Sequence, residues 1–207
     1  MRRFMALIAA ILILCLSVVS CKKNDTDEVG ATEKFSDPVD IGALDLSLYI
    51  ELGEYKGHQI ALVGNTSKGD AVWKTVLDSS RVIAYPEGQV RYYFERSKAS
   101  YEYLAKKGND TYENIIAGIG VTEDQMMNDA RALTKEDLVL HALIKAEGIV
   151  LTDEDKSNNF ERYVKKFVED YGYGEEYVRD EMTEQIYDTM LFDKTVERLI
   201  TLNTFVD

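Results

Sequence analysis

Amphipathic helical patterns run through the second half of this sequence, and they constrain its fold more than any other feature. The clearest pattern lies between Thr152 and Gly172. Three acidic residues follow Thr152, which is typical of a capped helix start, and Gly172 supplies a stop. The apolar residues between them recur at spacings of three and four, so they share one face: Phe160, Tyr163, Val164, Phe167, Val168 and Tyr171. We expect this helix to bury that face.

Similar patterns predict helices on both sides of this segment. Pro86 suits the first turn of a helix that ends at Gly108, and Thr122 opens a long helix that ends at Gly148. Asp137 interrupts the apolar stripe of the long helix, which predicts a bend or an exposed middle. Shorter helices are expected at 70–77, with Val72, Trp73 and Val76 on its apolar side, at 111–117 and around 177–178, with a terminal helix over 186–200.

These patterns predict an all-α chain with a short extended segment before the helical body. The extended segment is expected between Leu46 and Ile60, where alternating residues flank a Gly-Glu-Tyr-Lys-Gly turn. We divide the chain into an export signal (1–20), a flexible tether (21–45), a linking region (46–84) and a helical domain (85–207).

The first twenty residues have the parts of a bacterial export signal. Arg2 and Arg3 precede an apolar run from Phe4 to Val19, which is shorter than the roughly 20 apolar residues of a membrane span. The stretch Val18-Val19-Ser20-Cys21 resembles the lipobox of bacterial lipoproteins. That resemblance implies that Cys21 is acylated and that the signal is cut before it. An ordinary cleaved signal and a short uncleaved anchor are the alternatives.

Lipid on Cys21 would place the remaining chain outside the cytoplasm, on the bacterial cell membrane. Two or more acyl chains hold a protein firmly there, whereas one chain holds it weakly. Cleavage removes two arginines and no acidic residue, so the formal charge moves from −13 to −15. We expect so acidic a body to avoid nucleic acid. No cysteine follows Cys21, which excludes disulfides within the mature chain.

The sequence contains no recognisable catalytic or metal-binding pattern. His58 and His141 are the only histidines and stand in unlike segments. A phosphate-binding glycine loop, a nucleophile elbow and a cysteine nucleophile are all missing. The acidic pairs near Thr122 and Thr152 are explained by helix capping. We therefore predict no catalytic residues, no metal and no cofactor.

Tyrosine is unusually frequent, with thirteen residues. A tyrosine can bury its ring and keep its hydroxyl in water, so it suits adaptable binding surfaces. Packing between helices is the alternative explanation for each of them. Tyr92, Tyr103 and Tyr112 lie off the main apolar stripes, so we expect them to be exposed and to be the tyrosines available for binding other polypeptides.

Several segments resemble trigger factor in the same order along the chain. Residues 52–57 (Leu-Gly-Glu-Tyr-Lys-Gly) are similar to the strand that enters the later domains of trigger factor. Residues 142–149 (Ala-Leu-Ile-Lys-Ala-Glu-Gly-Ile), followed by Leu-Thr-Asp-Glu-Asp at 151–155, resemble its helix, Lys-x-Glu-Gly-Ile motif and Thr-Asp-Glu cap. Residues 76–87 and 171–174 add weaker similarity, and the resemblance covers roughly 46–202.

The resemblance implies a helical body with arms, like the C-terminal domain of trigger factor and the periplasmic chaperone SurA. The ribosome-docking domain of the family is replaced by the signal and tether, so no ribosome partner is expected. Only 59–84 separates the Tyr-Lys-Gly segment from the Tyr-Pro-Glu helix. That span is too short for the FKBP-type isomerase domain, so prolyl isomerase activity is implied by the family label alone.

These expectations combine into a membrane-tethered, extracytoplasmic chaperone-like protein that binds unfolded or newly exported polypeptides. Two alternatives remain open. One is a prolyl isomerase that works through an unrecognised site, and the other is a non-catalytic lipoprotein subunit that docks one dedicated partner.

Overall fold

The computed structural model describes residues 37–206, most of which lie in seven α-helices. The all-α class is therefore confirmed, with only short strands added. The predicted export signal, Cys21 and the tether up to residue 36 lie outside the described residues. The described chain forms two compact units, and neither is continuous in sequence. Unit 1 comprises residues up to 50 and 82–138, and unit 2 comprises 51–81 and 139–206.

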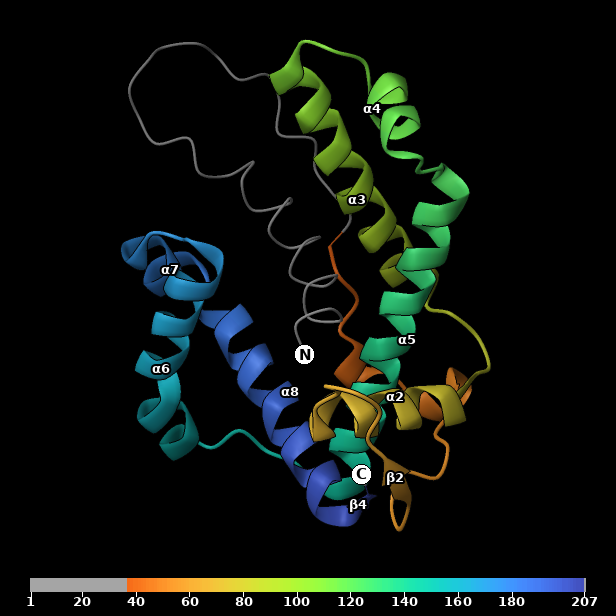
Figure 1. The fold of residues 1–207 in the computed structure, drawn as a ribbon, viewed down its shortest axis with the longest axis vertical. Coiled ribbons are helices and arrows are strands. Elements are labelled where there is room, and N and C mark those ends of the chain that lie inside the picture. Colours follow the sequence, from red (N-terminus) through yellow and green to blue (C-terminus); the bar gives the residue numbers. More distant parts are fainter. Residues whose placement is uncertain (1–36, 207) are drawn as a thin grey trace. The chain divides into compact units, whose positions relative to one another are not determined.

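Unit 1 contains two 3-10 helices, η1 (Ile41–Ala43) and η2 (Leu46–Leu48), and the helices α3 (Glu87–Gly108) and α4 (Tyr112–Ile119). It also contains the first part of α5 (Glu123–Glu147), up to Leu138. α4 packs beside the end of α3 (Figure 1). The buried apolar side chains of this unit are Ile41, Leu46, Ile50, Val90, Ala105, Met126, Ala130, Leu133 and Leu138.

The end of the predicted tether belongs to unit 1. Asp40 caps η1, Ile41 is only 4% exposed, and the backbone N–H of Val39 donates to Gln89 Oε1 on α3 at 2.9 Å. Gly88 faces Val39 so closely that an added Cβ would lie 2.9 Å from Val39 Cγ2. Residues 39–45 therefore form part of the folded unit, because one isoleucine among polar neighbours reaches the core.

Unit 2 contains α2 (Lys68–Ser79), α6 (Asp153–Tyr171), α7 (Glu175–Glu181), α8 (Thr183–Leu202) and the end of α5. Packing of α2 against α8 includes an edge-to-face contact between the rings of Trp73 and Phe192, with centroids 5.0 Å apart. α6 and α7 both pack against α8. The buried apolar side chains are Ile60, Val72, Trp73, Val76, Val139, Leu143, Tyr163, Val164, Phe167, Val178, Met182, Ile186, Met190, Val196 and Leu199.

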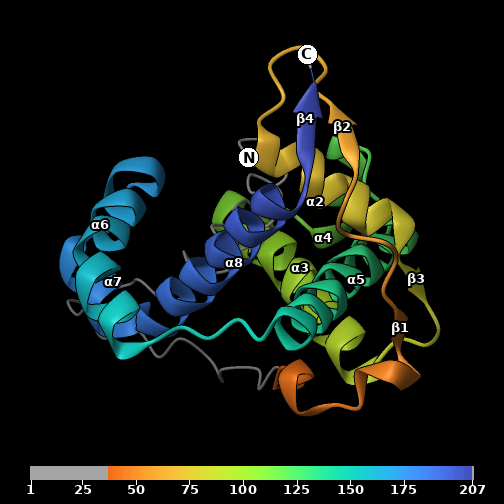
Figure 2. The same cartoon turned by 90° about the horizontal axis from the view of Figure 1, so that it is seen from below.

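The strands form two short pairs. β1 (Ile50–Glu51) pairs with β3 (Arg81–Val82), and residues 52–58 connect β1 to β2 as a loop. β2 (Gln59–Ala61) pairs in parallel with β4 (Thr204–Val206), with Ile60 opposite Phe205. Figure 2 shows these two strands side by side. The segment predicted to be extended between Leu46 and Ile60 is therefore strand only at 50–51 and 59–60, with η2 and a loop in the rest, and nothing in the sequence indicated the partner β4.

Helix ends follow the predicted capping chemistry. The Thr152 side chain accepts from the N–H of Asp155, and the Asp155 side chain accepts from the N–H of Thr152, which completes a capping box. Gly172 ends α6 in the left-handed region at φ 73°. Asn109 does the same for α3 at φ 51°, so Gly108, the predicted stop, is the last helical residue.

Candidate functional site

The three tyrosines predicted to bind clients all lie in unit 1 and are all half-buried. Tyr92 and Tyr103 are on α3, and Tyr112 is the first residue of α4. Eleven residues make three helical turns, so Tyr92 and Tyr103 share a face of α3 about 16 Å apart along its axis.

Tyr92 is contacted by the side chain of Arg96, which lies on the same helix. Arg96 Nη1 donates to the Tyr92 hydroxyl at 2.7 Å, and the guanidinium carbon lies 5.2 Å from the centre of the ring. The ring also meets Tyr93 edge-on, with centroids 5.3 Å apart. One face of Tyr92 is therefore covered by the chain itself.

Tyr112 is bound into a small network between α3, α4 and α5. Its hydroxyl donates to Glu123 Oε1 at 3.2 Å, and Lys98 Nζ lies 5.1 Å from the ring centre and donates to the same Glu123 oxygen at 3.0 Å. Burial, followed by the hydrogen bond to Glu123, raises the pKa of Tyr112 to about 12. Tyr112 thus has a positioning role for α4, in addition to any contact with a client.

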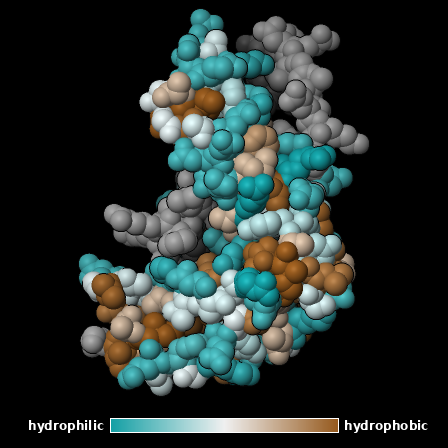
Figure 3. Space-filling model, turned by 90° about the vertical axis from the view of Figure 1, so that its right-hand side faces the viewer, coloured by the Kyte–Doolittle hydropathy of each residue, from teal (hydrophilic) through white to brown (hydrophobic). Residues whose placement is uncertain are grey.

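α4 presents the largest concentration of unburied aliphatic side chains on any one helix in unit 1. Its sequence, Tyr-Glu-Asn-Ile-Ile-Ala-Gly-Ile, holds three isoleucines in eight residues, yet none of its residues is buried. Ile115 and Ile116 are half-buried and Ile119 is 55% exposed. On the face drawn in Figure 3, hydrophobic residues form a patch near the upper end, at about the height of α4 in Figure 1.

The isoleucines of α4 were missed in the analysis of the sequence, which followed the tyrosines instead. The signal was present, because a short helix with three isoleucines between polar caps needs a partner surface to bury them. Thr111 caps the start through the N–H of Asn114, and Gly120 ends the helix at φ 71°. The local sequence therefore fixes α4 as a helix without providing cover for its apolar side chains.

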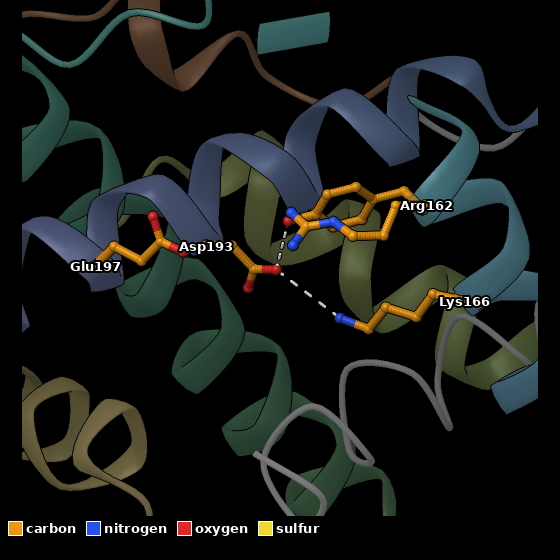
Figure 4. A pocket seen from close by; sticks show the side chains of 5 residues that line it. Arg162, Lys166, Asp193 and Glu197 are labelled. Atoms are coloured by element: carbon orange, nitrogen blue, oxygen red, sulfur yellow. Dashed lines mark hydrogen bonds and ion pairs between the residues drawn. The ribbon is translucent and has the colours of Figure 1, made fainter. Parts of the chain in front are cut away.

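A pocket of about 140 Å³ lies in unit 2, between α6 and α8. Its lining is charged, apart from one tyrosine. Figure 4 shows the Lys166 side chain pointing toward Asp193, with Glu197 farther along α8. The lining residues are Arg162, Tyr163, Lys166, Asp193 and Glu197.

Asp193 is the centre of this pocket. Its Oδ2 accepts a hydrogen bond of 2.7 Å from the Tyr163 hydroxyl and lies 3.8 Å from Lys166 Nζ. Burial, together with this hydrogen bond, raises the pKa of Tyr163, so its hydroxyl stays protonated at neutral pH. The Arg162 guanidinium carbon lies over the Tyr163 ring, 5.0 Å from its centre.

Within residues 37–206, no helix is both long and apolar enough to cross a membrane. The same residues contain no group of three histidine, cysteine or carboxylate side chains that could hold a metal ion. Cys21, the predicted lipidation site, lies outside this part of the chain. Comparisons of the chain with protein-family models, with curated proteins and with solved structures found no match.

Proposed function

We propose that this chain is a membrane-tethered, extracytoplasmic chaperone-like protein that holds unfolded or newly exported polypeptides without nucleotide. The observation that supports it most is α4, a helix in which no side chain is fully buried although three of its eight residues are isoleucine. The order of trigger-factor-like segments in the sequence also supports it, as does the lipobox-like stretch that ends at Cys21.

The isoleucines of α4 leave apolar surface in contact with water, which a bound polypeptide would bury. Full burial of an isoleucine side chain contributes about 1.5–3 kcal/mol, and the isoleucines of α4 realise only part of it within the chain. Contiguous apolar surface on a soluble unit is often an interaction site. Unfolded polypeptides expose apolar side chains in many orders, so a short aliphatic surface can bind many of them without a shaped pocket.

The half-buried tyrosines lie on α3 and at the start of α4, two helices that pack against each other. Tyr112 begins α4, and the network with Lys98 and Glu123 fixes its ring. Tyr103 is half-buried on α3. We propose that Tyr92, Tyr103 and Tyr112 contribute ring edges and hydroxyls to client binding, while the isoleucines contribute most of the apolar area.

The test uses the mature chain without its lipid. We expect it to slow the aggregation of several unfolded proteins at near-stoichiometric ratios. A triple variant, Ile115→Ser, Ile116→Ser and Ile119→Ser, should lose at least about half of that effect. The matched control removes three exposed aliphatic residues of unit 2 by Val63→Ser, Val150→Ser and Val206→Ser, and should keep it. No suppression by the parent chain, or equal losses in both variants, would contradict the proposal.

The alternatives give different outcomes. Acceleration of proline-limited refolding by substoichiometric protein would indicate an isomerase instead of a holding protein. Co-purification of one stoichiometric partner, without aggregation suppression, would indicate a docking subunit. For the membrane tether, Cys21→Ala should block signal cleavage, so the precursor should keep its apolar segment at 4–19. Unchanged processing would refute lipidation.

A further inference from the structure

α6 and α8 place charges of opposite sign on the two sides of the pocket in unit 2. Arg162 and Lys166 are four residues apart on α6, so they share a face of that helix. Asp193 and Glu197 have the same spacing on α8. The four formal charges cancel, and two interhelical ion pairs would be the simplest way to arrange them.

Only one of those two pairs forms, and it is loose. Lys166 Nζ lies 3.8 Å from Asp193 Oδ2, an oxygen that already accepts the Tyr163 hydroxyl. Among the described residues, no ion pair joins Arg162 to Glu197. The Arg162 guanidinium carbon instead lies over the Tyr163 ring, 5.0 Å from its centre. A guanidinium placed over a ring keeps N–H donors that the ring does not use.

The space left between these groups has the size of a small molecule. A cavity of about 150 Å³ is large enough for benzene, which has six heavy atoms. The pocket measures about 140 Å³. It is therefore suited to a ligand of about six to eight heavy atoms, and the charged lining requires that the ligand be polar.

We propose that this pocket binds a small zwitterion in which an ammonium group and an oxyanion are separated by a few bonds. In this arrangement the Arg162 guanidinium and the Lys166 ammonium bind the oxyanion, and the Glu197 carboxylate accepts the ammonium. Arginine is suited to the oxyanion because its planar fork can donate two parallel hydrogen bonds. The proposal is independent of the chaperone-like function, which concerns unit 1.

The charge balance of the pocket favours a ligand that carries both charges. A lone anion at Arg162 would be repelled by Asp193 and Glu197, and a lone cation at Glu197 would be repelled by the two bases. A zwitterion satisfies both sides without adding net charge. Two sources share this chemistry: free α-amino acids, and the phosphoethanolamine group found in lipid headgroups.

Ligand-observed NMR titrations of the full chain in a non-ionic detergent test the proposal. The probes are L-alanine and the methyl ester of O-phosphoethanolamine, a phosphodiester with one negative charge as in a lipid headgroup, with propionate and ethylammonium as ligands that carry one charge. We expect at least one zwitterion to bind at least about tenfold more tightly than either single-charge ligand. Tighter binding of L-alanine would assign the pocket to amino acids, and tighter binding of the phosphodiester to the headgroup. Equal binding of all four probes, or none up to about 50 mM, would overturn the proposal.

Two variants with matched controls locate the binding. Arg162→Gln and Glu197→Gln should each weaken the zwitterion at least about tenfold, because each removes a charge-assisted contact. Arg131→Gln and Glu181→Gln change the same charges at exposed positions elsewhere and should leave it unchanged. Circular dichroism checks that all four variants fold. Equal weakening in variants and controls would show that binding is non-specific and would refute the site.

Discussion

The Tyr93 hydroxyl donates a hydrogen bond of 2.8 Å to Asp137 Oδ2. Gln89 Nε2 donates to the same oxygen at 2.8 Å, and Gln89 is only 4% exposed. This cluster explains why an acidic residue interrupts the apolar stripe of α5. Asp137 is half-buried, so the predicted exposed middle is not found, and its carboxyl group binds α3 through two side chains.

Tyr93→Phe should destabilise the protein by about 1–3 kcal/mol, because a hydrogen bond to a buried or half-buried carboxyl group is lost while the ring remains. Burial, followed by the nearby Asp137, holds the pKa of Tyr93 well above its usual value, so the hydroxyl is a donor at neutral pH. Urea unfolding measures the change. Tyr103→Phe removes a hydroxyl from the same helix and should change the free energy of unfolding by less than about 0.5 kcal/mol. Equal shifts would contradict this role for Tyr93.

Glu147→Gln should also destabilise the protein, by about 1–3 kcal/mol. Its carboxylate is only 8% exposed, and it accepts 2.7 Å and 2.9 Å hydrogen bonds from the Tyr55 hydroxyl and Arg198 Nε. The hydrogen bond from Tyr55 is the largest cause that lowers the pKa of Glu147. Urea unfolding of this variant is compared with Glu181→Gln at an exposed position. If the unfolding free energies of the two variants differed by less than about 0.5 kcal/mol, Glu147 would not have this stabilising role.

The lowered pKa of Asp155 predicts that the folded protein loses stability at acidic pH. Hydrogen bonds from Lys194, and then from Thr152, lower its pKa from 3.8 to about 2. The folded state therefore favours the carboxylate, and its contribution is present above pH 3.8 and disappears as the pH falls to about 2. The stability gap between the parent chain and Asp155→Asn should be largest above about pH 5 and should close near pH 2. Thermal melting across this range tests it, and a stability gap that stayed constant down to pH 2 would contradict it.

Replacing Gly53 and Gly118 by alanine should change the stability of the protein in opposite directions. A Cβ at Gly53 would collide with the backbone carbonyl of Ser79, whereas a Cβ at Gly118 in α4 meets nothing within 4 Å. Gly53→Ala should therefore destabilise the protein by at least about 1 kcal/mol. Gly118→Ala should stabilise α4 by about 0.5–1 kcal/mol through the greater helix propensity of alanine. Urea midpoints that moved in the same direction would contradict this reading of the backbone.

The sequence predicted local structure well because helix signals are local. The capping box at Thr152, the stop at Gly172 and the apolar face of α2 all depend on neighbours within a few residues, and all three are confirmed. Val72, Trp73 and Val76 are buried as expected. The two units were not predictable in the same way, since each joins segments that lie far apart in the chain.

The candidate sites illustrate the same limit. The charged residues around the α6–α8 pocket have helical spacing, but only the packing of two helices brings Arg162 near Asp193 and Glu197. Tyr163 lies on a buried stripe, as its spacing predicted. The hydrogen bond from its hydroxyl to Asp193 was not predictable from the sequence. Exposure of the α4 isoleucines likewise depends on what other segments leave uncovered.

The pairing of β2 with β4 joins positions 145 residues apart, such as Gln59 and Thr204. During synthesis, residues 51–81 therefore emerge early and wait for 139–206 before unit 2 can close. Throughout that interval Val72, Trp73 and Val76 lack the α8 side chains that later shield them. Contacts of such long range form slowly and leave a growing chain open to aggregation. Unit 2 can therefore fold only after residues 139–206 have been made.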